Sequence, residues 1–460
     1  MAGEHRKLLS GWGRTAPTAA TVRPIGGPDD VREALKTAGP RGVLARGLGR
    51  AYGDAALNGG GTVLDATTLA GVHAFDAESG LLTVDAGVSL DTIMRAFVPL
   101  GWFVPVTPGT RFVTVGGAIA ADIHGKNHHV DGTFCRHVTQ LRLITPTGEE
   151  VCSAGDDAEL FWATAGGMGL TGVVVEATLR LLPIATSRMR VDTERAADLD
   201  DLMDRMDRGD DAYRYSVAWI DCVTGGSHLG RGVLTRGDHA AVDELPPKMR
   251  RDPLGYDARV RLAAPPMVPA GLVRPSTARL LNEAWFRKAP RSRTGAIHTI
   301  PSFFHPLDGV REWNRMYGAR GFLQYQFVVP FGAAEVVRTA VERLTAARCP
   351  SVLAVLKRFG PADPGPLSFP AAGWTLALDL PVGPPQLGPV LDELDELVVE
   401  AGGRLYLAKD SRMRPELLAA MYPQLDEWRA VCDRVDPDRV LQSDLDRRLG
   451  LRHGQGPSDA

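Results

Sequence analysis

Three glycine-rich segments in the first half of the chain are candidates for binding a phosphorylated ligand through the main chain. They are 47–53 (GLGRAYG), 108–120 (PGTRFVTVGGAIA) and 165–172 (AGGMGLTG). Glycine lets a ligand approach the backbone closely, and free backbone N–H groups bind phosphate oxygens. The first segment on its own is also compatible with a purely structural turn. The three segments together indicate an extended dinucleotide.

The first glycine segment does not have the pattern of a Rossmann NAD site. Its spacing is GxGxxxG rather than GxGxxG, and the glycines at 59–61 exclude the helix that a Rossmann unit places directly after its loop. We therefore expect the dinucleotide to be held in another kind of fold.

A polar segment at 124–129 (HGKNHH) could contact either a metal or an anion. His124 and His128 have the i, i+4 spacing of helical metal ligands, but Gly125 weakens a helix and Lys126 would repel a cation. Histidine and lysine beside a glycine suit phosphate or sugar oxygens better. We expect an anionic substrate here and no metal site; an ordinary solvated loop is the alternative.

In the second half, polar or small side chains recur at every second position of strand-like runs. They are Gln324, Gln326, Lys357, Thr375, Ala377 and Asp379. A sheet face covered by helices is apolar, so this pattern predicts a face that lines a wet cavity, with an ordinary solvent-facing side as the alternative. Lys409, in the run YLAKDSR at 406–412, could be a base or an anion contact, although an isolated lysine is most often a surface charge.

Short strands and helices must position these segments, and the pattern predicts an α+β fold. In the first half we expect strands in 41–65, 81–87, 138–146 and 172–182, a helix after the N-cap Ser89, and another in 158–167. In 188–402, strand-like runs alternate with helices at 333–346 and 387–401, which favours an antiparallel sheet with helices on one face. The Pro- and Arg-rich stretch 231–296 predicts long, flexible loops.

The composition excludes several classes of protein. The chain has 460 residues and a formal net charge of −3, which argues against nucleic-acid binding. No stretch approaches the roughly 20 apolar residues of a membrane span, and the N-terminus lacks a secretory apolar core. The five cysteines form no CxxC pair, so we expect buried or idle thiols. Composition alone predicts a soluble cytoplasmic protein.

Taken in chain order, long segments resemble flavoproteins of the vanillyl-alcohol-oxidase family, which have the PCMH-type FAD-binding fold. Among its members they are most similar to those from mycobacteria and related actinobacteria that oxidise a polyprenyl-phosphate ribose. The segments are 11–17, 45–54, 108–129, 157–172, 305–318, 321–330, 366–374 and 402–412. They occur in order along nearly the whole chain, from residue 11 to residue 412.

This resemblance implies a two-domain organisation and a set of cofactor contacts. Residues 6–187 would form the FAD-binding domain, 188–402 the substrate-binding domain, and 403–460 a segment that returns to the FAD domain. The residues implied to bind FAD are Arg46, Gly47, Gly49, Arg50, Tyr52, Gly53, Gly109, Thr110, Gly116, Gly117, Ala118, Asp122, Ile123 and Gly125. Many relatives attach the flavin to a histidine in the first loop, and 46–53 contains none, so we expect non-covalent FAD.

The implied reaction is oxidation of the ribose C2′ hydroxyl to a 2′-keto product. An NAD(P)H-dependent keto-reductase partner would complete epimerisation to arabinose for cell-wall arabinan. We expect Lys409 to position or deprotonate the hydroxyl, with Tyr406 and Gln326 orienting the sugar. The remaining substrate contacts would be His124, Lys126, Lys357, Thr375 and Ala377. An oxidase of a soluble sugar, alditol or aldonolactone on the same fold is the alternative, and a flavin-free binding protein is a third.

Two further expectations rest on the resemblance. The family implies the periplasmic side of the inner membrane, where the apolar residues Met267, Val268, Leu272 and Val273 would meet lipid. Ala377 stands where mycobacterial members carry the cysteine that nitroaromatic inhibitors modify, so covalent inhibition should fail. Thr375 replaces a usual amide and Phe304 a usual tyrosine.

Overall fold

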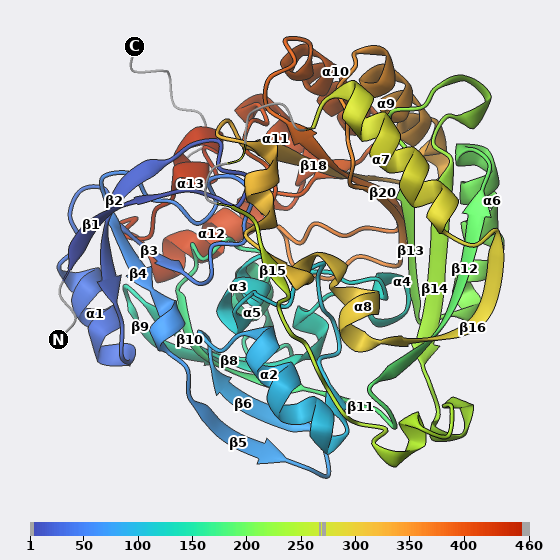
Figure 1. The fold of residues 1–460 in the computed structure, drawn as a ribbon. Coiled ribbons are helices and arrows are strands. Elements are labelled where there is room, and N and C mark those ends of the chain that lie inside the picture. The colour runs from blue at the N-terminus through green and yellow to red at the C-terminus, as the bar shows by residue number, and fades with distance from the viewer. Residues whose placement is uncertain (1–3, 266–267, 269–272, 453–460) are drawn as a thin grey trace.

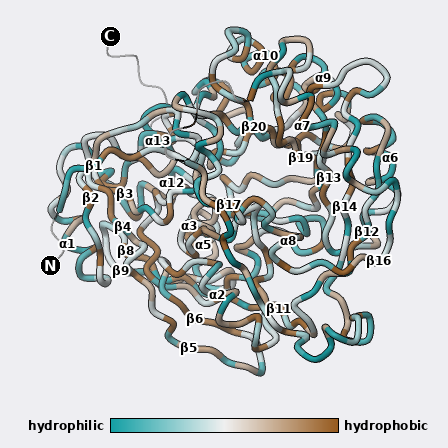
Figure 2. Tube along the Cα trace, in the orientation of Figure 1, coloured by the Kyte–Doolittle hydropathy of each residue, from teal (hydrophilic) through white to brown (hydrophobic). Residues whose placement is uncertain are grey.

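The computed structural model describes residues 4–265, 268 and 273–452, which form two groups of β-sheets with helices around them (Figure 1). Hydrophobic stretches run along the strands and inner helices, while the outer loops are largely hydrophilic (Figure 2). The five cysteines are free and buried, as the sequence predicts.

The first group consists of a four-stranded and a five-stranded sheet. In the first sheet β1 pairs antiparallel with β2, and β2, β4 and β3 are parallel; the second is antiparallel throughout, in the order β5-β6-β10-β8-β9. The bounds are β1 His5–Leu9, β2 Thr18–Pro24, β3 Val43–Arg46, β4 Thr62–Asp65, β5 Val72–Asp76, β6 Leu81–Asp85, β8 Val138–Thr145, β9 Gly148–Cys152 and β10 Val173–Arg180. The short strands β7 (Trp102–Phe103) and β11 (Leu182–Pro183) pair with each other.

Short helices connect these strands, and α3 contains Gly116 and Gly117 of the second glycine segment. They are α1 Pro28–Lys36, α2 Leu90–Phe97, α3 Val115–Ala120, α4 His128–Asp131 and α5 Ala158–Thr164. The predicted N-cap of α2 is confirmed, because the Ser89 hydroxyl accepts a hydrogen bond of 3.1 Å from the Thr92 amide. The predicted helix in 158–167 is α5, and the predicted strands in 41–65 are β3 and β4.

The second group is one antiparallel sheet of eight strands in the order β16-β12-β14-β13-β19-β20-β18-β21. Their bounds are β12 Arg188–Ala196, β13 Tyr215–Ile220, β14 Gly232–His239, β16 Ser292–Thr299, β18 Phe322–Val329, β19 Ala354–Phe359, β20 Gly373–Pro381 and β21 Arg404–Leu405. Helices α6 (Leu199–Gly209), α9 (Ala334–Ala346) and α10 (Leu387–Glu400) pack against one face of it (Figure 1). The predicted antiparallel sheet with helices on one face is confirmed, and so is the α+β fold class.

After β21 the chain packs against the first group of sheets. It forms α11 (Leu418–Met421), α12 (Leu425–Val435) and α13 (Asp444–Leu449). The Trp428 indole donates a 3.0 Å hydrogen bond to the Ala163 carbonyl, and the Arg448 guanidinium pairs with Asp54. The chain therefore crosses between the two groups of sheets twice.

The region 231–296 differs from the predicted long loops. It contains β14, β16, the short β15 (Leu262–Ala263) paired with β17 (Val310–Arg311), and the 14-residue helix α7 (Pro275–Lys288). The periodicity of α7 is inverted, because its buried positions include polar Asn282 while Leu280 and Leu281 are exposed. That inversion conceals the helix from a pattern that places apolar residues inside. The predicted lipid contacts Met267 and Leu272 lie outside the described residues.

Candidate active site

A cavity of about 1520 Å³ separates the glycine loops of the first half from the uncovered face of the eight-stranded sheet. Ligand pockets for a single drug-sized molecule are roughly 300–1,000 Å³. This cavity therefore has room for a dinucleotide and a second ligand side by side.

Most residues expected to bind FAD line this cavity. Those that line it are Arg46, Gly47, Gly49, Arg50, Tyr52, Gly109, Thr110, Gly116, Gly117, Ile123 and Gly125. The other three, Gly53, Ala118 and Asp122, do not line the cavity. The Asp122 carboxylate accepts hydrogen bonds from the Ser368 hydroxyl and the Cys135 amide, and burial raises its pKa to about 6. Asp122 therefore supports the loop rather than facing a ligand.

The first glycine loop fits a pyrophosphate. In the part of the chain that the structure describes, the amides of Gly47, Leu48, Gly49 and Arg50 donate to no protein acceptor, although all four residues line the cavity. Unpaired backbone donors beside a cavity are the groups that bind phosphate oxygens. The Arg50 guanidinium lies 3.8 Å from the centre of the Trp12 ring and adds positive charge there.

The loop is held in place from behind. The Arg46 guanidinium donates to the carbonyls of Ser10 and Ala56, at 2.8 and 2.7 Å. Gly49 has a φ of +64°, and a Cβ at this position would lie 2.2 Å from the Arg46 guanidinium. Arg46 thus has a supporting role, and Gly49 allows the tight approach.

The second glycine segment acts differently from the prediction. The Gly116 amide donates to the Ala86 carbonyl at 2.8 Å, and the Gly117 amide donates to the hydroxyl of Thr114, the N-cap of α3. Because these amides are already used, the two glycines contribute a flat wall without side chains rather than donors.

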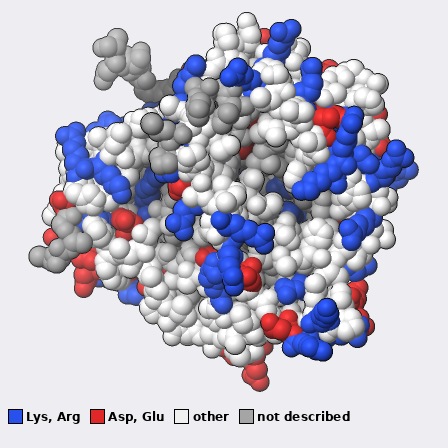
Figure 3. Space-filling view, in the orientation of Figure 1, with Lys and Arg blue, Asp and Glu red and all other residues white. Residues whose placement is uncertain are grey.

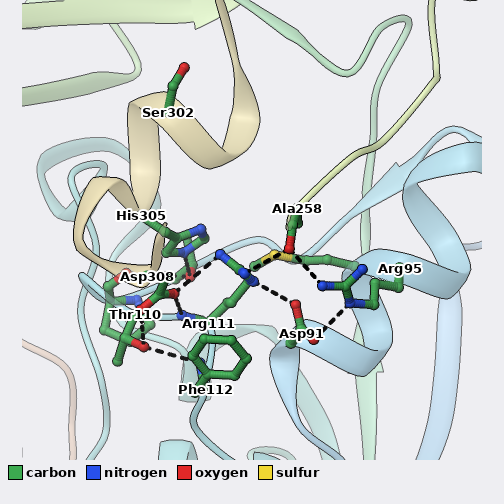
Figure 4. A network of polar contacts seen from close by, with 12 residues as sticks. Asp91, Arg95, Thr110, Arg111, Phe112, Ala258, Ser302, His305 and Asp308 are labelled. Carbon is green, nitrogen blue, oxygen red and sulfur yellow. Dashed lines mark hydrogen bonds and ion pairs between the residues drawn. The ribbon is translucent and has the colours of Figure 1, made fainter. Parts of the chain in front are cut away.

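A network of charged groups fixes the loop that carries Thr110 (Figure 4). The Thr110 hydroxyl donates a 2.7 Å hydrogen bond to the Asp308 carboxylate, which also accepts from the Arg111 amide at 2.9 Å. The fully buried Arg111 guanidinium donates to Asp91 and to the Ala258 carbonyl. The network ties 110–111 to the segments around 258 and 308. Nothing in the sequence pattern marks Arg111 or Asp308, because their partners are distant in the chain.

Next to residues expected to bind FAD, the same cavity is lined by a cluster of buried basic side chains. His124, Lys126, Lys357 and Lys409 all line it. Lys357 Nζ lies 3.0 Å from His124 Nδ1, and His124 Nε2 lies 3.2 Å from the amide nitrogen of Gln326. The structure therefore brings together residues from the 124–129 segment, β18, β19 and the segment after β21.

Burial lowers the basicity of this cluster. It lowers the pKa of Lys126 to about 7 and that of Lys409 to about 8, while the nearby Asp379 carboxylate counteracts the effect on Lys409. The pKa of Lys357 falls well below its usual value because of burial and the positive charges of Lys409 and Lys126. Bound anionic groups would favour the protonated amines, so the cluster suits a phosphorylated ligand.

Four of the alternating residues line the cavity, as predicted: Gln324, Gln326, Lys357 and Ala377. Thr375 and Asp379 do not line the cavity themselves but contact residues that do. The Gln326 amide donates to the Thr375 hydroxyl at 3.0 Å, and Gln324 donates to Asp379. Burial raises the pKa of Asp379 to about 7. Asp379 is a functional candidate that the sequence pattern includes without assigning it a role.

Tyr406 is positioned differently from the expectation that it orients a sugar through its hydroxyl. The ring lines the cavity, but the hydroxyl donates a 2.7 Å hydrogen bond to the Ala121 carbonyl. Its ring also stacks on Phe369, with 4.6 Å between the ring centres. Tyr406 therefore acts as a fixed wall.

The histidines at 128 and 129 have protein partners rather than the arrangement of metal ligands. The His128 ring accepts from the Gly360 amide, and the His129 ring contacts the Tyr213 carbonyl. Within 4–265, 268 and 273–452, no three His, Cys, Asp or Glu side chains are grouped as metal ligands.

No helix in the same residues combines the length and apolarity needed to cross a bilayer.

Comparison with known proteins agrees with this geometry. Residues 19–153 match a family of FAD binding domains. The fold and the site together define an FAD-dependent oxidoreductase with a PCMH-type cofactor domain and an eight-stranded antiparallel sheet. The chain is 47% identical, over 97% of its length and 98% of the relative's, to decaprenylphosphoryl-β-D-ribose oxidase of Mycolicibacterium smegmatis. The chain belongs to that oxidase's family.

Two other relatives extend the comparison. An uncharacterised protein encoded 5′ of mprA in Streptomyces coelicolor is 46% identical over 79% of this chain and its own full length. L-gulono-1,4-lactone dehydrogenase of Mycobacterium tuberculosis is 23% identical over 94% of this chain and 96% of its own.

Proposed function

We propose that this protein oxidises the C2′ hydroxyl of decaprenylphosphoryl-β-D-ribose to the 2′-keto compound, the first half of epimerisation to the arabinose derivative used in cell-wall arabinan. The observation that carries the proposal is the cluster of Lys126, Lys357, Lys409 and His124 beside the dinucleotide loops, in a member of this oxidase family. The cluster suits a sugar phosphate that lies next to a flavin.

Lys409 is the proposed proton acceptor. Oxidation removes a hydride from C2′ and a proton from its hydroxyl, and the chemistry that FAD supplies when bound is acceptance of the hydride. The proton passes from the hydroxyl oxygen to the neutral amine of Lys409, whose pKa near 8 leaves a useful neutral fraction. Asp379, held by Gln324, tunes this amine. His124, Lys126 and Lys357 bind the phosphate and sugar oxygens, and Gln326 orients the ring.

FAD is proposed to be bound without a covalent link. The main-chain donors of 47–50 and the Arg50 side chain would hold its pyrophosphate, and Gly116, Gly117 and Ile123 would lie against the flavin. The segment 46–53 offers no histidine for attachment.

The wider context follows from the chemistry of substrate and product. A 2′-keto sugar requires a reductase to complete epimerisation, so we propose an NAD(P)H-dependent keto-reductase as partner. A decaprenyl chain resides in a membrane, so we propose peripheral contact with the inner membrane on its periplasmic side. We also propose that residues 6–187 form the FAD-binding domain, that 188–402 form the substrate-binding domain, and that 403–460 return to the FAD domain.

Anaerobic reduction of the bound flavin tests the activity. Protein loaded with FAD is mixed with farnesylphosphoryl ribose, a soluble analogue of the substrate, and the visible absorbance of oxidised flavin is followed. We expect complete bleaching in the wild type and a loss of rate of about 10²–10⁴ in Lys409→Ala. FAD released by denaturation into the supernatant would support the non-covalent assignment.

The same experiment separates the alternative function. Xylitol and an aldonolactone serve as soluble donors, since the lactone dehydrogenase relative is aligned along nearly all of the chain. A flavin that bleaches with either of these and remains oxidised with farnesylphosphoryl ribose would contradict the proposed substrate. A purified protein that takes up no FAD would contradict the enzyme assignment.

A further inference from the structure

An apolar row of side chains crosses the cavity face of the eight-stranded sheet. It starts at Gln326, next to the basic cluster. In the register of the sheet, Gln326 pairs with Ala377, Ala377 with Val355, Val355 with Trp219, and Trp219 with Val233. All five side chains line the same cavity. Because neighbouring strands lie about 4.8 Å apart, the four steps from β18 to β14 span about 19 Å.

The row is apolar although it faces a cavity rather than packed helices. Along β13, Ala218 and Ile220 are buried toward the helices, whereas Val217 and Trp219 on the alternate face are only partly buried and face the cavity. Beyond Gln326, the directly paired positions carry no charge. Along this row the lining therefore changes from the polar Gln326 to apolar side chains that reach β14.

Helix α7 contributes apolar side chains to the far part of the cavity. Leu281 and Trp285 line it, yet they are 56% and 52% exposed. The helix is fixed through polar contacts instead: the Asn282 amide donates to Asp221 at 2.8 Å, and Arg231 bridges Asp221 and Glu283. These polar contacts anchor the helix, while about half of the surface of the Leu281 and Trp285 side chains stays exposed at the cavity.

We propose that this row and the cavity side of α7 bind the isoprenoid chain of the substrate, so that the enzyme recognises the lipid tail as well as the ribose phosphate. The inference rests on the proposed function and adds a binding site to it. The tail is the occupant that the geometry favours, because the row is continuous with the cluster that binds the phosphate. A tail joined to that phosphate could extend from the basic cluster along the row toward β14.

The surface around α7 is consistent with an anionic lipid nearby. Figure 3 shows Lys and Arg side chains over the middle of this face and beside α7. Arg279, Arg287 and Lys288 lie on the helix itself. A purely membrane-docking helix would use all of its exposed apolar residues, whereas a tail site uses only those that face the cavity. This difference makes the proposal testable.

The first experiment measures how the tail contributes to binding. Ribose phosphates esterified with methyl, geranyl and farnesyl groups are compared in the detergent-free FAD-loaded enzyme. We expect KM to fall by at least about tenfold from methyl to farnesyl, with kcat nearly constant, since each buried methylene contributes about fourfold. Equal KM values for the three compounds would overturn the proposal while leaving the proposed reaction intact. If the wild type oxidises none of them, the proposed function itself fails.

The second experiment uses neighbouring leucines on α7 as a matched pair. Leu280 is 71% exposed and does not line the cavity, whereas Leu281 does. We expect Leu281→Ser and Trp219→Ala to raise KM for the farnesyl compound by about three- to tenfold and to leave KM for the methyl compound unchanged. Leu280→Ser should behave as the wild type.

The membrane alternative predicts another pattern. If Leu280→Ser and Leu281→Ser weaken binding to phosphatidylglycerol vesicles equally and neither changes KM for the soluble farnesyl compound, α7 is a membrane anchor and the tail site is wrong. FAD content and thermal unfolding of each variant are measured first, and Val355→Thr provides a second change within the row that keeps the volume nearly constant.

Discussion

The side chains of His124 and Lys357 meet across the cavity, with Nδ1 and Nζ 3.0 Å apart although the residues are 233 positions apart in the chain. Burial and the charges of Lys357 and Lys409 lower the pKa of His124 well below its usual value. Burial likewise lowers the pKa of Lys357. The pair therefore favours a neutral state without ligand, and a bound phosphate would draw a proton into it.

Lys357→Gln should weaken binding of the phosphorylated substrate. A hydrogen bond to a charged group contributes about 1.5–3 kcal/mol, so we expect KM to rise by roughly tenfold or more with a smaller change in kcat. Steady-state kinetics with farnesylphosphoryl ribose measure this. Lys36→Gln, an exposed site on α1, is the control. An unchanged KM would remove Lys357 from the phosphate site.

The pH dependence of kcat/KM should report the protonation of Lys409. Its neutral amine is the active form and its pKa is about 8, so kcat/KM should rise about tenfold per pH unit below pH 8 and level off above it. The Asp379 carboxylate raises the pKa of Lys409, so Asp379→Asn should move the midpoint to lower pH. A midpoint that stays in place in this variant would mean that Asp379 does not tune Lys409; Asp426→Asn on the surface is the control.

Ala377 should make the enzyme insensitive to covalent nitroaromatic inhibition. The side chain lines the cavity opposite Gln326 on the neighbouring strand and offers no thiol. Intact-protein mass spectrometry after turnover with such an inhibitor should show no adduct in the wild type and one adduct in Ala377→Cys. The buried cysteines of the native chain serve as the internal control. An adduct on the wild type would show that another thiol is reached.

Gly49→Ala should reduce FAD binding without unfolding the protein. The substitution places a Cβ 2.2 Å from the Arg46 guanidinium at a φ of +64°, which disfavours the observed loop. We expect the Kd for FAD to rise about tenfold or more, for a cost of about 1–3 kcal/mol. Gly155→Ala, where a Cβ meets nothing within 4 Å, is the control, with fluorescence titration of apoprotein as the measurement. Equal affinities in both variants would contradict the role of the loop.

Local features were readable from the sequence. The glycine segments, the Ser89 cap and the alternating polar strands each depend on residues close together in the chain, where propensity and periodicity act. The sequence pattern did not predict helix α7, because polar Asn282 is buried and Leu280 and Leu281 are exposed, which reverses the usual pattern of an amphipathic helix.

Tertiary structure decided what each polar group does. The Gly116 amide is used by Ala86, the Tyr406 hydroxyl by Ala121, and the Thr110 hydroxyl by Asp308, so none of them is free for a ligand in the manner that residue type suggests. A hydrogen-bonding group is satisfied by whichever partner the fold brings within about 3 Å, and such partners lie far away in the chain. The sequence by itself determined which chemistry was available, and packing determined which groups remained to perform it.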